Sequence, residues 1–386
     1  VVLFSVIVSV SCINNGLGMT PQMGWNSWNF YGCDGYNYTV LRNTADAFFT
    51  SGLYDAGYRY LNIDDCWAEY NRTENGQLEP DQEKFPPGQT LQDLIDYIHS
   101  RGLLFGIYSD AGERTCANHD PGSLGYEQID AQTFADWGVD YLKYDNCNNE
   151  HERALERYPP MRNALNATGA PIFFSLCEWG REEVPTWGRA IGNSWRTTKD
   201  IKDRWTSMLY NLYLNNLWAD YAGPGGWNDP DMLEVGNGGM TNTEYISHFS
   251  LWSLMKAPLI VGCDLTSMDS DTINILTNSE VIAVNQDPRG IQGKLIRSPT
   301  FETEIWSGPL VDGNVAVILF NRGEQSANIT LDWKDMNILS SQSASLRDLW
   351  AHKDIGIFTG SYTAEVESHG VVMLRVIPSY CINYPD

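Results

Sequence analysis

The sequence predicts a (β/α)8 barrel at residues 13–289, followed by a smaller antiparallel β-sandwich domain at residues 290–386. Two observations predict the barrel. Short apolar runs alternate with amphipathic segments of helical length from about residue 21 to residue 288, and several of these runs end at an acidic residue. A third observation predicts the second domain, because helical periodicity nearly disappears after residue 290.

Five apolar runs predict the second, third, fourth, fifth and eighth strands of the barrel, at residues 60–63, 104–108, 141–144, 172–175 and 259–261. The clearest helical pattern between two runs covers residues 90–102, where Thr90 is a suitable N-cap and Gly102 a suitable residue just past the last turn. Strand, helix and strand repeated in this way predict parallel βαβ units. The spacing of the runs, continued through weaker signals near Trp195, Trp227 and Leu259, favours eight units over a shorter doubly wound sheet.

Acidic residues follow four consecutive predicted strands, namely Asp64-Asp65, Asp110, Asp145 and Glu178. One acidic residue after a strand is usually a helix N-cap. The C-terminal ends of barrel strands, however, meet at one face of the molecule, where active sites of this fold lie. The series of four, with Asp231 as a fifth member, therefore predicts an acidic cavity at that face.

Cysteines follow the first four predicted strands, and neighbouring parallel strands bring their loops side by side. The predicted disulfides are Cys33–Cys66 and Cys116–Cys147. Cys177 and Cys263 end strands that are not neighbours, so both are predicted to be unpaired. No C-x-x-C pair occurs, which excludes a zinc ribbon and a thioredoxin-type redox motif.

The segment from about residue 291 predicts antiparallel strands because its apolar runs are β-branched and separated by turn residues. The clearest runs are residues 315–320, 328–332 and 370–376. No internal repeat or low-complexity tract is visible.

Composition excludes some classes of function. The chain carries 49 acidic and 25 basic side chains, a net charge of −24, and would repel both nucleic acid and anionic lipid headgroups. A hydrophobic fraction of 42% is enough for a sizeable core and excludes extensive disorder. The 14 Trp and 20 Tyr residues include enough rings to form platforms for sugars, although most of them are expected in the core.

The N-terminus predicts secretion. Residues 1–10 form an uncharged apolar run that is too short to span a bilayer but has the length of a signal-peptide h-region, so residues 1–12 are predicted to be a signal-peptide remnant. The alternative is a buried strand. Four N-x-[ST] sequons would accept glycans on the secretory route, and no other stretch is apolar enough for a membrane helix. The sequons lie at Asn37, Asn71, Asn166 and Asn328.

A strand at residues 141–145 would place Tyr141, Lys143 and Asp145 on one side, facing the cavity. A lysine beside a carboxylate keeps that carboxylate ionised, as a nucleophile at an acetal carbon must be. The alternative is a buried Lys–Asp pair that only stabilises the barrel.

A glycosidase needs a second carboxylate, protonated at rest, to protonate the leaving oxygen. Asp200 and Asp203 are the candidates after the sixth predicted strand. The residues alone do not choose between them, since either could pair with Lys199, Lys202 or Arg204.

The adjacent carboxylates of Asp64 and Asp65 suit a sugar, because an ionised carboxylate accepts hydrogen bonds from neighbouring hydroxyls. The axial 4-hydroxyl and the 6-hydroxyl of galactose are the expected partners. A divalent-metal site is the alternative, but no H-E-x-x-H or histidine cluster supports it. G-x-S-x-G, Walker and G-x-G-x-x-G motifs are also missing from the sequence, so no cofactor and no metal are expected.

Six ordered motifs resemble glycoside hydrolase family 27, and within it the secreted α-galactosidases (melibiases) of fungal and plant type. The resemblance extends from about Gly16 onward. The motifs are M-G-W-N-S-W at 23–28, I-D-D-C-W at 63–67, G-I-Y-S-D at 106–110, Y-L-K-Y-D-N-C at 141–147, W-R with Asp200 from 195, and G-W-N-D-P-D-M at 226–232.

This resemblance implies a (β/α)8 barrel with a C-terminal β domain and hydrolysis with retention of configuration. It implies that Asp145 is the nucleophile and Asp200 the acid/base. Galactose-binding positions correspond to Asp64, Asp65, Lys143 and Arg196, and the pocket wall to Trp28, Tyr108 and Met232. The expected substrates are galacto-oligosaccharides of the melibiose and raffinose type and galactomannan.

The resemblance also locates specificity in the loop after the fifth strand. Here Cys177, Glu178 and Trp179 are bulky where an N-acetyl group needs small side chains, which predicts galactose by steric exclusion at the 2-position. Animal members have a second cysteine that pairs with the Cys177 position, whereas this chain has Gly192-Asn193-Ser194 there. The alternatives are the same machinery acting on β-L-arabinopyranosides or α-N-acetylgalactosaminides, and a galactose-binding lectin. The lectin would lack a catalytic carboxylate, and both are present.

Overall fold

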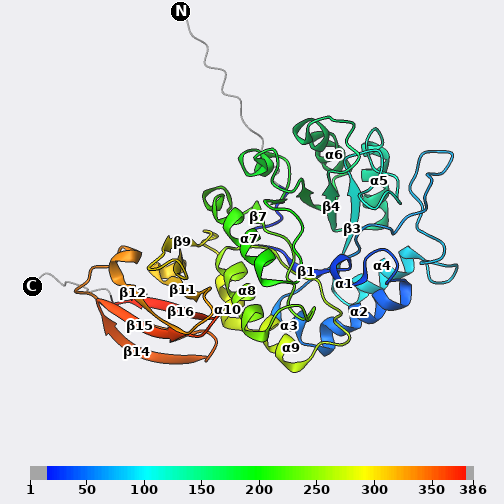
Figure 1. Ribbon diagram of the computed structural model, residues 1–386. Helices are drawn as coiled ribbons and strands as arrows, with labels where there is room; N and C mark the ends of the chain where they lie inside the picture. The colour runs from blue at the N-terminus through cyan, green and yellow to red at the C-terminus, as the bar shows by residue number, and fades with distance from the viewer. Residues whose placement is uncertain (1–14, 380–386) are drawn as a thin grey trace, which may run out of the picture.

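The computed structural model describes residues 15–379, so the predicted signal-peptide remnant lies outside the described residues. Eight parallel strands form the barrel, in the hydrogen-bonded order β7-β6-β5-β4-β3-β2-β1-β8 (Figure 1). The strands are β1 (Met23–Asn26), β2 (Tyr60–Asn62), β3 (Leu104–Asp110), β4 (Tyr141–Asp145), β5 (Phe173–Cys177), β6 (Ser194–Arg196), β7 (Trp227–Asp229) and β8 (Leu259–Val261). The predicted fold class is confirmed.

The ring is closed between β7 and β8 by the segment that follows β7. Pro230 comes directly after β7 and has no backbone N–H to donate, so the strand cannot continue its ladder. Leu233 makes the backbone hydrogen bonds to the β8 segment instead, because its N–H donates to the Ile260 carbonyl at 2.8 Å and its carbonyl accepts from the Gly262 N–H at 3.1 Å. Asp231 and Met232, which lie between β7 and Leu233, line a cavity of the barrel.

Helices cover the outside of the barrel. They are α1 (Trp28–Tyr31), α2 (Tyr38–Thr50), α3 (Leu53–Ala56), α4 (Leu91–Ser100), α5 (Glu127–Trp137), α6 (Ala154–Thr168), α7 (Trp205–Asn216), α8 (Asn242–Leu254), α9 (Ser270–Leu276) and α10 (Ser279–Asn285). Thr90 caps α4 in a capping box with Asp93, as its N-cap position predicted. The connection from β5 to β6 differs from a regular βα unit, because it contains only the short 3-10 helices η1 (Val184–Thr186) and η2 (Gly188–Ala190).

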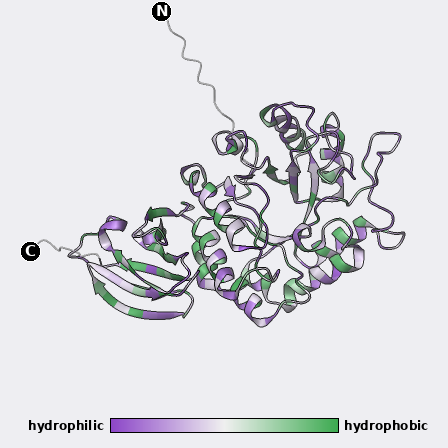
Figure 2. Ribbon diagram, in the orientation of Figure 1, coloured by the Kyte–Doolittle hydropathy of each residue, from purple (hydrophilic) through white to green (hydrophobic). Residues whose placement is uncertain are grey.

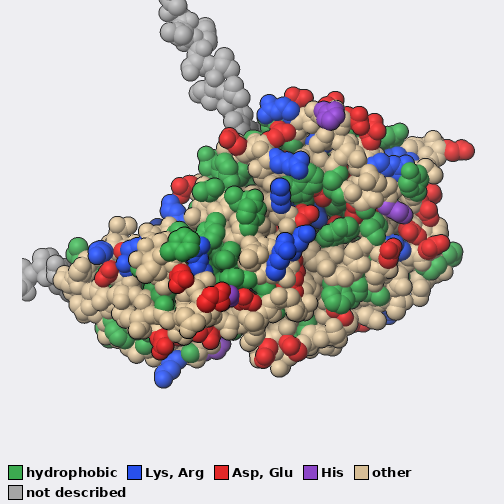
Figure 3. Space-filling view, viewed as in Figure 1, with side chains coloured by type: hydrophobic (Ala, Val, Ile, Leu, Met, Phe, Trp, Pro, Cys, Tyr) green, Lys and Arg blue, Asp and Glu red, His purple; other side chains and the backbone are tan. Residues whose placement is uncertain are grey.

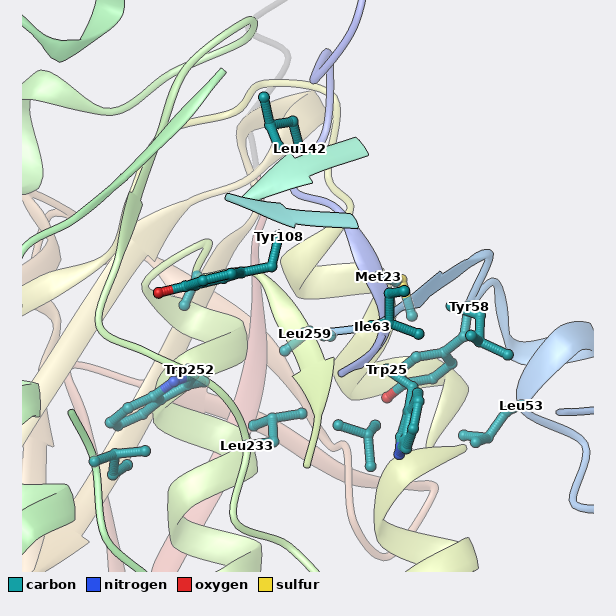
Figure 4. Close-up of a cluster of buried hydrophobic side chains, with 14 of the residues drawn as sticks. Met23, Trp25, Leu53, Tyr58, Ile63, Tyr108, Leu142, Leu233, Trp252 and Leu259 are labelled. Carbon is teal, nitrogen blue, oxygen red and sulfur yellow. The ribbon is translucent and has the colours of Figure 1, made fainter. Parts of the chain in front are cut away.

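Strand alternation separates the cavity from the core. On β4, Leu142 and Tyr144 are fully buried among the hydrophobic side chains outside the sheet, whereas Lys143 and Asp145 line the cavity. Figure 4 shows Leu142 and Tyr108 together with buried side chains from other strands and helices of the barrel, such as Trp25 and Trp252.

The C-terminal domain is an antiparallel sandwich beside α8 and α10 (Figure 1). A six-stranded sheet has the order β14-β13-β16-β11-β10-β9, and β12 pairs with β15 in a second sheet. The strands are β9 (Lys294–Arg297), β10 (Thr303–Pro309), β11 (Val315–Asn321), β12 (Ala327–Asp332), β13 (Ser343–Asp348), β14 (Lys353–Thr359), β15 (Ser361–Val366) and β16 (Val371–Pro378).

β11 contributes to two cores, and Figure 2 shows the hydrophobic residues along this sheet. Val317 and Leu319 point into the sandwich, where they pack with Ile329 and Leu331 of β12. Ile318 and Phe320 belong to the core that the domain shares with the barrel. Alternate residues of one strand therefore hold the sandwich together and attach it to the barrel.

Both predicted disulfides are present, Cys33–Cys66 and Cys116–Cys147, and Cys177 and Cys263 are buried free thiols. In the part of the chain that the structure describes, no helix is long and apolar enough to cross a bilayer. Acidic side chains are spread over the face shown in Figure 3, as the net charge leads one to expect.

Candidate active site

The predicted acidic cavity exists at the C-terminal ends of the barrel strands and has a volume of about 160 Å³. It is lined by Trp28, Asn29, Asp64, Asp65, Tyr108, Cys116, Lys143, Asp145, Cys147, Trp179, Arg196, Asp200, Ile201, Asp231 and Met232. A second cavity of about 30 Å³ lies deeper in the barrel and shares Lys143, Arg196, Asp231 and Met232 with the first.

Asp145, at the end of β4, is 5% exposed and is held by two hydrogen bonds. The Tyr108 hydroxyl donates to Oδ2 at 3.0 Å, and the Asn146 N–H donates to Oδ1 at 2.9 Å. Burial raises the pKa of Asp145 to about 6, and the charge of Lys143 opposes this rise. The carboxylate is fixed in orientation and is costly to ionise.

The lysine on β4 pairs with a different carboxylate from the one expected. Lys143 Nζ donates to Asp64 Oδ2 at 2.7 Å, and the Asn26 amide donates to the same oxygen at 2.8 Å. The long side chain reaches two strands away, to the end of β2, instead of turning back to Asp145 on its own strand. Lys143 therefore acts on Asp145 only through its charge, and the geometric pair is Lys143–Asp64.

Asp65 is held in place by backbone donors from two loops. Its Oδ1 accepts from the Cys66 N–H and its Oδ2 from the Ala117 N–H, both at 2.8 Å. Burial raises the pKa of Asp65, and these hydrogen bonds counteract the rise. The two disulfides lie next to the donors, at Cys66 and Cys116, and so fix the loops that position this carboxylate.

The structure distinguishes between the two acid/base candidates, Asp200 and Asp203. Asp200 lines the cavity with its side chain 68% exposed, and Arg196 Nη2 donates to its Oδ1 at 3.1 Å. Asp203 lies outside the cavity, where its carboxylate accepts from the Tyr245 hydroxyl and the Gly239 N–H. Arg196 lowers the pKa of Asp200, although partial burial opposes this. The Arg196 guanidinium favours the ionised form of Asp200, whereas a general acid must carry a proton when it acts.

The loop after β5 corrects one expected contact. Cys177 lines the deeper cavity and Trp179 the larger one, but Glu178 lines neither. Its side chain is 0% exposed and accepts from the Glu182 N–H at 2.5 Å. β5 ends at Cys177, and Trp179 lies in a turn with a φ of 63°, so the local turn and not strand alternation brings Trp179 to the cavity while Glu178 contacts its own loop.

The wall residues lie as expected, since Trp28, Tyr108 and Met232 all line the cavity. The sequence did not indicate Asn29 or Ile201 as lining residues, and it gave Asp231 no more than a place in the acidic series. Asp110, Cys116, Asp145 and Cys147 have ligand atoms within 4.8 Å of one another. The two sulfur atoms are joined in a disulfide, however, and are not available as thiolate ligands.

Carboxylates at the strand ends, two cations between them and aromatic walls around a cavity of this size define a barrel hydrolase of the glycosidase class. Comparison with known proteins gives the family. A family model described as alpha galactosidase A matches residues 20–287, and one described as the alpha galactosidase C-terminal beta sandwich domain matches residues 300–376. The chain belongs to the α-galactosidase (melibiase) family, glycoside hydrolase family 27.

Individual relatives match over nearly their whole length. The α-galactosidase of Cyamopsis tetragonoloba is 55% identical over 94% of this chain and 88% of its own. The crystal structure of α-galactosidase I from Mortierella vinacea has a TM-score of 0.89 at 41% identity and covers 94% of this chain and 98% of its own. That of the Saccharomyces cerevisiae enzyme with raffinose has a TM-score of 0.90 at 33% identity, with coverage of 95% and 99%.

Proposed function

We propose that the protein is a retaining exo-α-galactosidase that removes terminal α-D-galactosyl residues from galacto-oligosaccharides of the raffinose type. The observation that carries this proposal is the placement of two carboxylates in one cavity, Asp145 buried and Asp200 at the exposed side. A terminal sugar enters a closed cavity, and its leaving group stays at the mouth. The exposed carboxylate therefore meets the leaving oxygen, and the buried one meets the sugar.

In the first step, Asp145 attacks the anomeric carbon, the bond from that carbon to the leaving oxygen breaks, and Asp200 gives its proton to that oxygen. In the second step, Asp200 takes a proton from water, the water oxygen attacks the anomeric carbon, and the ester bond to Asp145 breaks. The hydrogen bonds from Tyr108 and the Asn146 N–H hold the attacking carboxylate in one orientation through both steps.

The pair of carboxylates must share one proton. We place this proton mainly on Asp145 before substrate binds, because burial raises the pKa of Asp145 to about 6 whereas Arg196 lowers the pKa of Asp200. The productive arrangement, with Asp145 ionised and Asp200 protonated, is the less populated form of the same charge state. A leaving sugar that covers Asp200 removes water from it and favours that form. We expect kcat/KM to fall above about pH 6, where the single proton is lost.

Specificity for galactose is proposed to rest on Asp64, Asp65 and Trp179. The two carboxylates are held in place as hydrogen-bond acceptors for hydroxyls, and the large Trp179 ring, which lines the same cavity, is proposed to exclude an N-acetyl group. Rates on matched p-nitrophenyl glycosides test this proposal. Hydrolysis of the α-galactoside well above the β-L-arabinopyranoside and the α-N-acetylgalactosaminide is expected, and the reverse order would contradict it.

The mechanism is tested by Asp145→Ala with and without azide. The variant is expected to lose nearly all turnover, and azide is expected to restore part of it by forming β-galactosyl azide in the space that the carboxylate leaves. Asp203→Ala is the matched control, because Asp203 lies outside the cavity. Substantial turnover of Asp145→Ala without azide would refute the assignment.

Secretion and glycosylation remain proposals, and the sequon geometry supports them. All four sequon asparagines are exposed. Asn37 caps α2 by accepting from the Val40 N–H through Oδ1, which leaves its amide nitrogen for a glycan. Treatment of the protein from a eukaryotic host with an N-glycosidase should lower its mass, and an unchanged mass would contradict this part of the proposal.

A further inference from the structure

Asp231 has a position that the proposed mechanism does not yet use. It lies just after β7, is 5% exposed, and has a φ of 86°, which is unusual for a residue with a side chain. The Trp252 indole N–H donates to its carbonyl at 2.9 Å, and the Asp229 carboxylate accepts from its N–H at 2.8 Å. The surroundings therefore hold a strained backbone in place, and with it one carboxylate that points into the cavity.

The Asp231 carboxylate contacts both the arginine that pairs with Asp200 and the backbone next to Asp200. Its Oδ2 lies 3.0 Å from Arg196 Nη2, the same nitrogen that donates to Asp200 at 3.1 Å. The same Oδ2 accepts from the N–H of Ile201, the next residue after Asp200, at 2.8 Å. One oxygen atom of Asp231 thus binds the cation that pairs with Asp200 and the backbone that carries it.

We propose that Asp231 is a positioning residue for the acid/base Asp200, which shares the charge of Arg196 with it and anchors the backbone beside it. This inference rests on the proposed function of Asp200. Without a second carboxylate, the whole charge of Arg196 would act on Asp200 and hold it in the ionised form that cannot protonate a leaving group.

The remaining charges around the pair do not replace this function. Groups that face Arg196 or Asp200 are Lys143 and Asp145 from β4, Cys177 from β5, Lys202 from the loop after β6 and Asp229 from β7. The two lysines act in the same direction as Arg196 and favour ionised Asp200. Asp145 and Asp229 form no ion pair with Arg196 among the described residues, whereas Asp231 pairs with the same Arg196 nitrogen as Asp200.

Asp231→Asn tests the inference, because the amide keeps the volume and an oxygen acceptor but removes the charge. Loss of that charge should lower the pKa of Asp200 further, because the Arg196 charge then acts on Asp200 without a competing carboxylate. We expect kcat/KM for melibiose, which has a poor leaving group, to fall about tenfold, and kcat/KM for an activated aryl α-galactoside to fall much less. The alkaline limb of the pH profile, which belongs to Asp145, should not move.

The matched control is Asp130→Asn. Asp130 is also a buried carboxylate paired with an arginine, Arg72, at 2.6 Å, but it lies outside the cavity. It should lose stability without any change in leaving-group dependence. If Asp231→Asn behaves in the same way, Asp231 is only structural and the inference is wrong.

A second variant tests the inference if Asp231→Asn folds poorly. Asp231→Gly removes the carboxylate and suits the positive φ, and it should show the same leaving-group dependence with a larger loss, since the Ile201 anchor is also lost. Asp200→Ala separates this inference from the proposed function. If Asp200→Ala shows no leaving-group dependence, the assignment of Asp200 fails; if it does while both Asp231 variants do not, only the inference about Asp231 fails.

Discussion

Tyr108→Phe removes one of the two hydrogen bonds that the Asp145 carboxylate accepts and leaves the ring in place. A hydrogen bond to a charged group contributes about 1.5–3 kcal/mol, which corresponds to about 1–2 units of pKa. The pKa of Asp145, raised to about 6 by burial, should therefore rise further. Since the single proton of the pair is then held more firmly on Asp145, the productive form, with Asp200 protonated, becomes about 10–100 times rarer.

The assay is kcat/KM for a p-nitrophenyl α-galactoside between pH 4 and pH 8. The plateau should fall about 10–100-fold, and the alkaline limb should move to higher pH by about 1–2 units. Tyr144→Phe is the control, because its buried hydroxyl on the same sheet has no hydrogen-bond partner in the described part of the chain and the variant should leave both quantities unchanged. An alkaline limb that stays fixed or moves to lower pH in Tyr108→Phe would refute the reasoning.

Three further predictions concern stability, specificity and the second domain. Asp145→Asn should raise the free energy of unfolding by about 3 kcal/mol at pH 7 but not at pH 4, since ionising this buried carboxylate is costly only above its raised pKa of about 6. Equal thermal midpoints of the variant and the unchanged protein at pH 7 would contradict this. Trp179→Ala should shift the kcat/KM ratio toward the α-N-acetylgalactosaminide, whereas Glu178→Ser, whose side chain faces away from the cavity, should not; a shift caused by the second variant would show that the loop was misassigned. A chain that ends at Pro288 should aggregate, because α8 loses its cover from Ile318 and Phe320; a soluble and fully active truncated chain would contradict this.

The fold could be predicted largely because buried parallel strands are continuous apolar runs, and five such runs coincide with β2, β3, β4, β5 and β8 to within two residues. Closure of the barrel could not be predicted in this way. It depends on Pro230 ending the ladder of β7 and on Leu233 replacing it, which is a contact between segments distant in sequence. The irregular connection from β5 to β6 could not be predicted either, because short 3-10 helices have no periodic pattern in the sequence.

The site shows which inferences from sequence fail and why. Alternation on β4 correctly predicted that Lys143 and Asp145 face the cavity. It could not predict the partner of Lys143, because a four-carbon side chain spans the distance to Asp64 two strands away. Glu178 lines neither cavity, because its carboxylate accepts from the Glu182 N–H within the same loop, and this contact depends on a turn that no sequence pattern indicates. The importance of Asp231 depends on β6 and β7 being neighbours, which no local pattern contains.

The charge balance of the cavity explains why so many of its groups are held in unfavourable states. Five carboxylates line it, Asp64, Asp65, Asp145, Asp200 and Asp231, against two cations, Lys143 and Arg196. Burial of this excess of negative charge costs stability, as the raised pKa values of Asp65, Asp145 and Asp231 show. The proposed substrate is neutral, but the anomeric carbon becomes positively charged in the transition state. A cavity that is too negative for its own ground state is therefore complementary to that transition state, so the same carboxylates lower the stability of the fold and the barrier to hydrolysis.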